Sequence, residues 1–176
     1  MREIQSTIGV LVVGILSACI VGAQEKVAQS GTTANEPSAS CPVTTPLEPA
    51  FVPPEPYPGK ASNGNFYFGT AKLWTLVWKS PWRALPKWDV GYRQKIFWWS
   101  QGYDWRGDPQ PQLSITGKRL DGPAPPLVTD DQANGSYRGD MQSFVVSGVS
   151  FPTTGCWEIT GRLHGDELRF VVWVGK

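Results

Sequence analysis

Short runs of alternating apolar and polar residues dominate the chain from about residue 63 to its end. In the clearest run, Trp157, Ile159 and Leu163 alternate with polar residues. His164-Gly165-Asp166 then turns the chain, and the alternation resumes at Leu168. Successive side chains of a strand point to opposite faces, so this pattern predicts a hairpin with one buried face.

The same pattern predicts seven strands, and no window of helical length carries an apolar stripe of 3.6-residue period. Turns rich in Gly, Pro, Asn and Asp separate the strands, and we interpret Asn134-Gly135 as one such turn. Several short strands with turn signals between them are typical of a β-sandwich or barrel. The predicted strands are 65–68, 71–79, 93–100, 112–120, 142–151, 155–163 and 167–174.

The segment Phe151-Pro152-Thr153-Thr154-Gly155-Cys156-Trp157 resembles the corner before the penultimate strand of immunoglobulin-like domains. In such corners a Gly is followed two residues later by an aromatic residue, usually Tyr, whose hydroxyl bonds to the backbone. Trp157 stands in that place here, so this hydrogen bond is not implied. We therefore expect an all-β, immunoglobulin-like antiparallel β-sandwich, preceded by a signal peptide and a Pro-rich tether.

The N-terminal apolar run covers residues 8–16 and is too short for a permanent transmembrane helix, which needs roughly 20 apolar residues. Its length fits a signal peptide. Leu16-Ser17-Ala18-Cys19 resembles the lipobox of bacterial lipoproteins, in which the Cys becomes the new N-terminus and carries the lipid. This resemblance implies a signal peptide over 1–18 and a membrane anchor at Cys19. The alternative is a secreted soluble protein cleaved after Ala23, and both alternatives place the mature chain outside the cytoplasm.

Residues 19–58 are small, polar and rich in proline, with eight prolines between 37 and 58. Such composition favours extended, partly polyproline II structure, and we expect a flexible tether here. The folded domain would then cover 59–176.

The chain has three cysteines, so a lipid on Cys19 leaves Cys41 and Cys156 to form a disulfide in an oxidising compartment. The alternative is two free or separately buried thiols. Cys156 is adjacent to Trp157 on its strand and so faces away from the core. Its partner must therefore reach it from outside the sandwich, as a Pro-rich segment carrying Cys41 could.

Three segments resemble an uncharacterised family of bacterial exported lipoproteins that end in an immunoglobulin-like sandwich. The resemblance implies the fold and an envelope location over most of 41–176, and it implies no catalytic residue. The segments are Cys41-Pro42-Val43-Thr44, Leu113-Ser114-Ile115-Thr116-Gly117-Lys118-Arg119-Leu120-Asp121-Gly122-Pro123-Ala124-Pro125-Pro126-Leu127, and Phe151-Pro152-Thr153-Thr154-Gly155-Cys156-Trp157-Glu158-Ile159-Thr160-Gly161.

Aromatic residues are concentrated in the middle of the chain, with thirteen between 66 and 105. Residues 60–106 also carry eight basic side chains against two acidic ones. A sandwich core uses part of these aromatics, and packing at core edges or under the 80–92 loop is the alternative for the rest. Exposed Trp beside Arg is suited to stacking on sugar rings or to a protein interface. The candidate ligand-binding residues are Trp82, Trp88, Trp105, Arg83 and Arg106.

The sequence gives little indication of nucleophilic catalysis, because the chain has one histidine and no Gly-x-Ser-x-Gly nucleophile motif. We expect no catalytic residue, no metal site and no cofactor. The near-neutral net charge of +1 and the exported location argue against nucleic acid as a partner. The leading hypothesis is a non-catalytic envelope module that binds protein or glycan. The alternatives are a hydrolase of envelope polymers with an unrecognised carboxylate pair, and a purely structural spacer domain.

Overall fold

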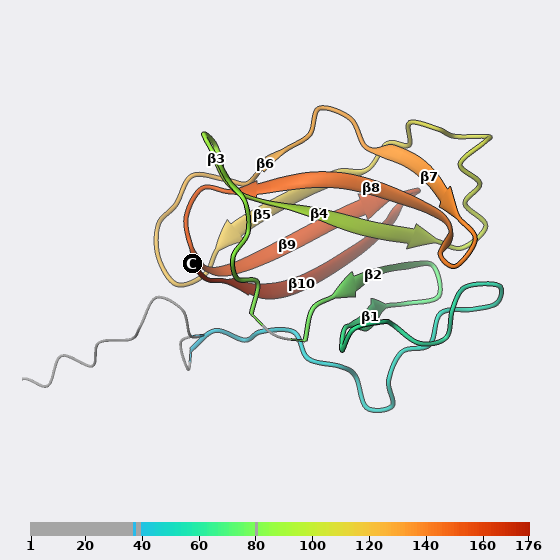
Figure 1. Cartoon of the computed structure of the whole chain (residues 1–176), viewed down its shortest axis with the longest axis horizontal. Coiled ribbons are helices and arrows are strands. Elements are labelled where there is room, and N and C mark those ends of the chain that lie inside the picture. Colours follow the sequence, from blue (N-terminus) through green and yellow to red (C-terminus); the bar gives the residue numbers. More distant parts are fainter. Residues whose placement is uncertain (1–36, 38–39, 80) are drawn as a thin grey trace, which may run out of the picture. The chain divides into compact units, whose positions relative to one another are not determined.

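A computed structural model describes residue 37 and residues 40–79 and 81–176, so Cys19 and the predicted signal peptide lie outside the described residues. In these residues every regular element is a strand, which confirms the all-β prediction (Figure 1). The strands are β1 (Phe66–Gly69), β2 (Leu73–Val77), β3 (Lys87–Trp88), β4 (Gly91–Ser100), β5 (Ser114–Arg119), β6 (Val128–Thr129), β7 (Asn134–Arg138), β8 (Gln142–Phe151), β9 (Gly155–Leu163) and β10 (Asp166–Val174).

The strands form two antiparallel sheets. The larger has the order β1-β2-β4-β8, with β6 and β7 both pairing with β8 and β3 pairing with the start of β4. The smaller has the order β10-β9-β5. A constant-type immunoglobulin sandwich has four strands in one sheet and three in the other. The larger sheet has the same strand order when β2, β4 and β8 are its first three strands and β6 and β7 together are the fourth. The smaller sheet supplies the other three strands, β5, β9 and β10. The predicted sandwich is confirmed, and β1 and β3 are additions to it.

The main core fills the space between the two sheets. Trp157 and Ile159 of β9 meet Trp98 of β4 there, and Phe170 and Val172 come from β10. These are the faces that the alternation predicts for the last hairpin, so that prediction is confirmed.

The corner before β9 is closed by a tryptophan. The indole N–H of Trp157 donates a hydrogen bond to the carbonyl oxygen of Thr153 at 3.0 Å. This bond from ring to backbone plays the part that a tyrosine hydroxyl plays in related corners. Trp157 is fully buried, so the same side chain also fills the core.

Cys41 and Cys156 form a disulfide, as the cysteine count predicts. Cys156 lies on the outer face of the smaller sheet, next to Val171 and Trp173. Backbone hydrogen bonds secure the same contact, since the Thr44 N–H donates to the Val171 carbonyl at 2.9 Å. The partner cysteine thus reaches β9 from outside the sandwich.

Residues 41–65, which we call the N-terminal arm, pack against the sandwich. Tyr57 is buried, with its ring edge-on to Trp74 at a centroid distance of 4.9 Å. Residues 41–58, the described end of the predicted tether, therefore contact the sandwich through the disulfide and through Tyr57. The arm has the composition of a linker, but a disulfide and aromatic contacts hold it in place.

Candidate functional site

The dense aromatic segment is divided between the two faces of the larger sheet. Trp98 points into the core between the sheets, whereas Phe97 and Trp99 point to the outer face. Trp74 of β2 joins Trp99 there, with the two rings parallel at a centroid distance of 6.5 Å. Aromatic rings on an outer face are stabilised when they are shielded from water, and the N-terminal arm buries part of this face.

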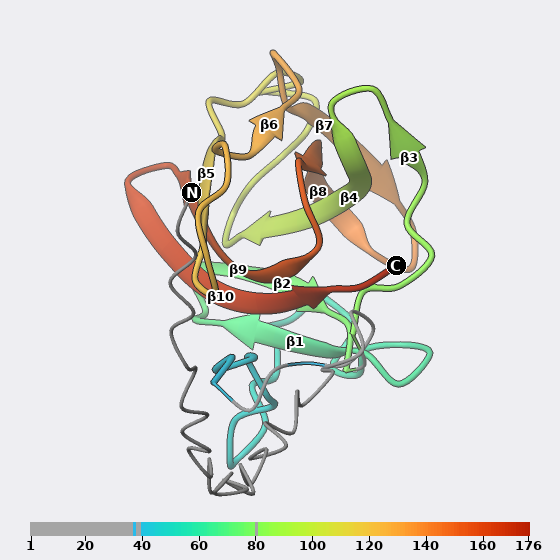
Figure 2. The ribbon, with the colours of Figure 1, turned by 90° about the vertical axis from the view of Figure 1, so that its left-hand side faces the viewer.

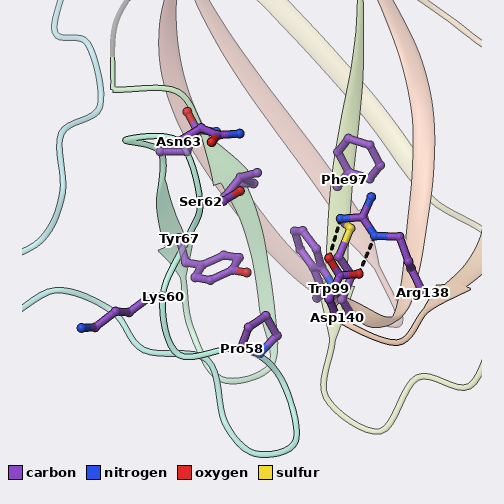
Figure 3. Close-up of a pocket in the computed structure, with 12 residues that line it drawn as sticks. Pro58, Lys60, Ser62, Asn63, Tyr67, Phe97, Trp99, Arg138 and Asp140 are labelled. Atoms are coloured by element: carbon purple, nitrogen blue, oxygen red, sulfur yellow. Dashed lines mark hydrogen bonds and ion pairs between the residues drawn. The ribbon is translucent and has the colours of Figure 1, made fainter.

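A groove with a volume of about 390 Å³ crosses this outer face next to the arm (Figure 3). Leu76, Phe97 and Trp99 form its floor. One wall comes from the arm and β1, including Tyr67, and the other from the turn between β7 and β8. We call it the aromatic groove. It is lined by Pro58, Lys60, Ser62, Asn63, Asn65, Tyr67, Leu76, Phe97, Trp99, Arg138, Asp140 and Met141.

Trp99 is packed firmly into the floor of the groove by a hydrogen bond and a ring contact. Trp99 is 2% exposed, and its indole N–H donates to the carbonyl oxygen of Met141 at 3.0 Å. Tyr67 stands edge-on to Trp99 at 5.7 Å. The half-buried side chains of Leu76 and Phe97 are left as the apolar surface that a ligand could touch.

An ion pair borders the groove on the β7–β8 side. Arg138 Nε lies 2.5 Å from Asp140 Oδ1, and a second bond joins Nη2 to Oδ2 at 2.9 Å. The hydrogen bond from Arg138 lowers the pKa of Asp140, and the pKa of Arg138 is raised in turn. The pair therefore offers donors and acceptors side by side while its two charges cancel.

The opposite wall carries neutral polar groups. Ser62, Asn63 and Asn65 contribute a hydroxyl and two amides, and Lys60 adds a cation at the edge. Asn63 has a positive φ of 57°, which asparagine tolerates better than most residues. The arm therefore turns sharply here to bring its polar side chains to the groove.

Trp82, one of the candidate binding residues, lies in the core and not on an exposed surface. It is 2% exposed and packs edge-on to Phe151 at 5.8 Å. Its backbone forms a parallel bridge to Val174 at the end of β10. This pairing with a strand 92 residues later buries the ring, although the neighbouring Arg83 is exposed.

Trp88 is exposed, with 58% of its surface open to solvent. It ends β3, and the chain turns at Asp89 and Val90 before β4 begins. The guanidinium of Arg93 lies 5.1 Å from the indole centroid and forms an ion pair with Asp130. A cation–π contact therefore holds the exposed ring.

Asp130 has a further partner, since the Gly148 N–H donates to its Oδ2 at 2.7 Å. Burial by itself raises the pKa of the Asp130 carboxyl. The hydrogen bonds from Arg93 and Gly148 outweigh that effect, so the pKa is lowered. The carboxylate remains charged at neutral pH and fixes Arg93 beneath Trp88.

Trp105 is half-buried beside the exposed Arg106, whose guanidinium lies 5.1 Å from the indole centroid. The same cation lies 6.0 Å from the ring of Tyr137. The five candidate binding residues are therefore not brought together. Trp88 and Trp105 lie beyond opposite ends of β4, and Trp82 is inside.

The lining of the aromatic groove includes one carboxylate, Asp140, which is paired with Arg138. A hydrolase of the kind considered above needs two carboxyl groups facing a bond. In the part of the chain that the structure describes, no group of three or more His, Cys, Asp and Glu is placed to hold a metal ion. The same residues include no helix of the length and apolarity needed to cross a bilayer.

The sequence did not identify Tyr67, Phe97, Arg138 or Asp140 as site residues. One signal was available: three consecutive aromatic residues in a predicted strand must place rings on both faces. Phe97-Trp98-Trp99 is such a run, so an aromatic outer face follows from it. The pairing of Arg138 with Asp140 has no comparable sequence signal.

Comparison with known proteins does not assign the chain to a family. No family model matches the sequence, and no curated protein is significantly similar to it. One solved structure matches, titled in its own description as a "Putative Lipoprotein from Bacillus anthracis", at 17% identity and a TM-score of 0.36. The match covers 68% of this chain and 85% of that one. At this identity and TM-score the similarity assigns neither a fold nor a function to the present chain.

Proposed function

We propose that this chain is an exported, lipid-anchored envelope protein that binds a glycan in the aromatic groove without catalysing a reaction. The observation that carries the proposal is the groove itself, with an apolar floor between two polar walls. Its volume lies in the range of small-molecule sites, about 300–1,000 Å³. The lipobox-like segment ending at Cys19 and the Cys41–Cys156 disulfide support the exported location.

A sugar ring suits the groove because it has apolar C–H faces and hydroxyl groups around its edge. The C–H face would lie on Phe97 and Leu76. Hydroxyl groups both donate and accept hydrogen bonds, and the pair of Arg138 and Asp140 offers acceptors next to donors. The side-chain amide of Asn63, on the opposite wall, also offers both a hydrogen-bond donor and an acceptor.

Other ligand classes match the groove less well. An acyl chain needs a dry apolar channel, whereas polar groups border this groove on two sides. An anionic ligand would have to rely on Lys60 at the edge of the groove, because Arg138 is already paired with Asp140. The absence of a second carboxylate from the lining argues against glycan cleavage.

The test is calorimetric titration of the full-length protein with solubilised peptidoglycan fragments and with N-acetylglucosamine oligomers. We expect saturable binding to at least one of these probes. Phe97→Ala should weaken it by about tenfold or more, ~1.4 kcal/mol, because the stacking surface is lost. Asp140→Asn should also weaken it, since an amide cannot maintain the ion pair.

Tyr137→Ala is the matched control, because Tyr137 is an exposed aromatic residue of β7 that does not line the groove. It should bind as the unsubstituted protein does. Absence of binding to both probes, or equal affinities for Phe97→Ala and Tyr137→Ala, would contradict the proposal. In that case a purely structural spacer becomes the better description.

A further inference from the structure

Exposed apolar side chains gather at one end of the sandwich. Trp88 and Val90, at the turn between β3 and β4, are 58% and 48% exposed. Val128 pairs with Ser150 near the end of β8 and is 43% exposed. Leu120 is 39% exposed, and its N–H donates to the carbonyl of Cys156.

Strand register places these residues around the corner between β8 and β9. Tyr92, one residue after the hairpin turn, pairs with Phe151, the last residue of β8. Gly91 packs so closely on the Phe151 carbonyl that a Cβ there would lie 2.1 Å from its oxygen. In Figure 1, β3 and the C-terminus are at this end, whereas β7 is near the opposite end. Figure 2 faces this end and shows β3 at the rim of the fold.

The hairpin also carries positive charge. Residues 83–95 contain four basic side chains and one acidic one. Lys87 and Lys95 are exposed, and Arg93 forms an ion pair with Asp130 beneath the indole. The turn itself holds one acidic residue, Asp89, between Trp88 and Val90. An exposed tryptophan with lysines on the flanking strands is suited to a membrane interface: tryptophan favours the headgroup region, and lysine side chains extend toward lipid phosphates.

The described chain approaches the sandwich at the same end. Cys41 is bonded to Cys156 in the second position of β9, directly after the corner. Cys19, the predicted lipid site, is 22 positions before Cys41 in the sequence. A chain of that length spans at most roughly 75 Å, so a lipid at Cys19 would confine the domain to that distance from the bilayer. Confinement of that kind makes a weak surface contact effective.

We propose that the Trp88–Val90 tip and the cations around it form a membrane-docking surface, which seats this end of the sandwich on a bilayer containing anionic lipid. The occupant is lipid and not the ligand of the aromatic groove. This proposal goes beyond glycan binding: it rests on the lipid anchor of the proposed function and not on the aromatic groove. Docking would hold the sandwich in one orientation to the membrane.

Tryptophan fluorescence gives a direct test. The structure describes all nine tryptophans, and Trp88 alone is exposed. The full-length protein is reconstituted with vesicles of phosphatidylcholine, with or without phosphatidylglycerol, whose acyl chains are brominated. Bromine quenches an indole that reaches the acyl chain boundary. We expect quenching in the anionic vesicles, less in the neutral ones, and a decrease with added salt.

Two variants assign the signal. Trp88→Phe should lose most of the quenching, whereas Trp105→Phe, beyond the other end of β4, should retain it. Flotation of the vesicles with bound protein reports the anchor separately from docking. If the protein floats with the vesicles but shows no quenching, or if Trp88→Phe is quenched as strongly as the unsubstituted protein, the docking surface is refuted. Either result leaves the glycan-binding proposal standing.

Discussion

Replacing Gly161 by alanine tests how the two sheets pack together. Gly161 lies on the core-facing side of β9, opposite the indole of Trp98 on β4. A Cβ at this position would lie 2.2 Å from Cη2 of Trp98 and 2.4 Å from Cζ3. Trp98 is fully buried and packs against Phe170 at a centroid distance of 5.9 Å, so the ring has no free space to enter.

The expected loss of stability follows from that distance. Carbon atoms in contact lie about 3.5–4.0 Å apart, so the new methyl group overlaps the indole by more than 1 Å. Overpacking of a dense core costs typically about 1–3 kcal/mol. The neighbour here is a rigid ring, so we expect the free energy of unfolding to fall by about 3 kcal/mol. That is a large fraction of the total for a domain of this size.

Urea unfolding followed by tryptophan fluorescence measures the change. Trp98→Phe is destabilising alone because it leaves a cavity. In that background Gly161→Ala should be neutral or stabilising, which gives a coupling energy of about 3 kcal/mol or more. Gly139→Ala is the control, because a Cβ at Gly139 would meet nothing within 4 Å. A loss below about 1 kcal/mol for Gly161→Ala, or an equal loss in both backgrounds, would refute the reasoning.

Three further predictions concern the disulfide and two titrating groups. Replacing Cys41 and Cys156 by serine opens a loop of sequence separation 115 and should lower the free energy of unfolding by up to about 5 kcal/mol; urea unfolding with a loss under about 1 kcal/mol would contradict this. Asp130 has a lowered native pKa, so its contribution is present above the unfolded value near 3.9 and is lost as the pH falls toward the native value. Asp130→Asn should reduce the dependence of the free energy of unfolding on pH in the acid range, as urea unfolding at several pH values would show. An unchanged dependence would show that the ion pair with Arg93 does not stabilise the fold. Burial and the nearby Asp108 and Asp104 carboxylates raise the pKa of Tyr103 to about 12, so stability should fall as the pH rises from about 10 to 12. Tyr103→Phe should remove that loss, as alkaline unfolding monitored by circular dichroism would show.

The sequence predicted those strands that show a regular alternation of apolar and polar residues. β9 and β10 were clear because one face of each is buried, which produces strict alternation. β3 and β6 were missed, since strands of two residues are too short for a period to show. β7 was missed because Asn134-Gly135 was interpreted as a turn. Gly135 instead lies within β7, where a Cβ would be 2.1 Å from the hydroxyl of Tyr103.

Burial imposed by distant residues could not be predicted. Trp82 is flanked by Pro81 and Arg83 and has the local character of a loop residue, but its pairing with Val174 places it in the core. The aromatic groove draws on four separate stretches of sequence, of which only Phe97-Trp98-Trp99 has a local signal. The docking of the arm was anticipated only at Cys41, through the orientation of Cys156 on its strand.

The Cys41–Cys156 bridge determines where tension would enter the domain. Any pull on the residues before Cys41 passes through the bridge into β9, which is hydrogen-bonded to β10 on one side and to β5 on the other. The arm and the edge strand β1 lie within the covalent loop and bear none of that load. In the reduced protein the same pull would act first on the arm and then on the edge strand β1, so the bridge transfers the load from an edge strand to a central one.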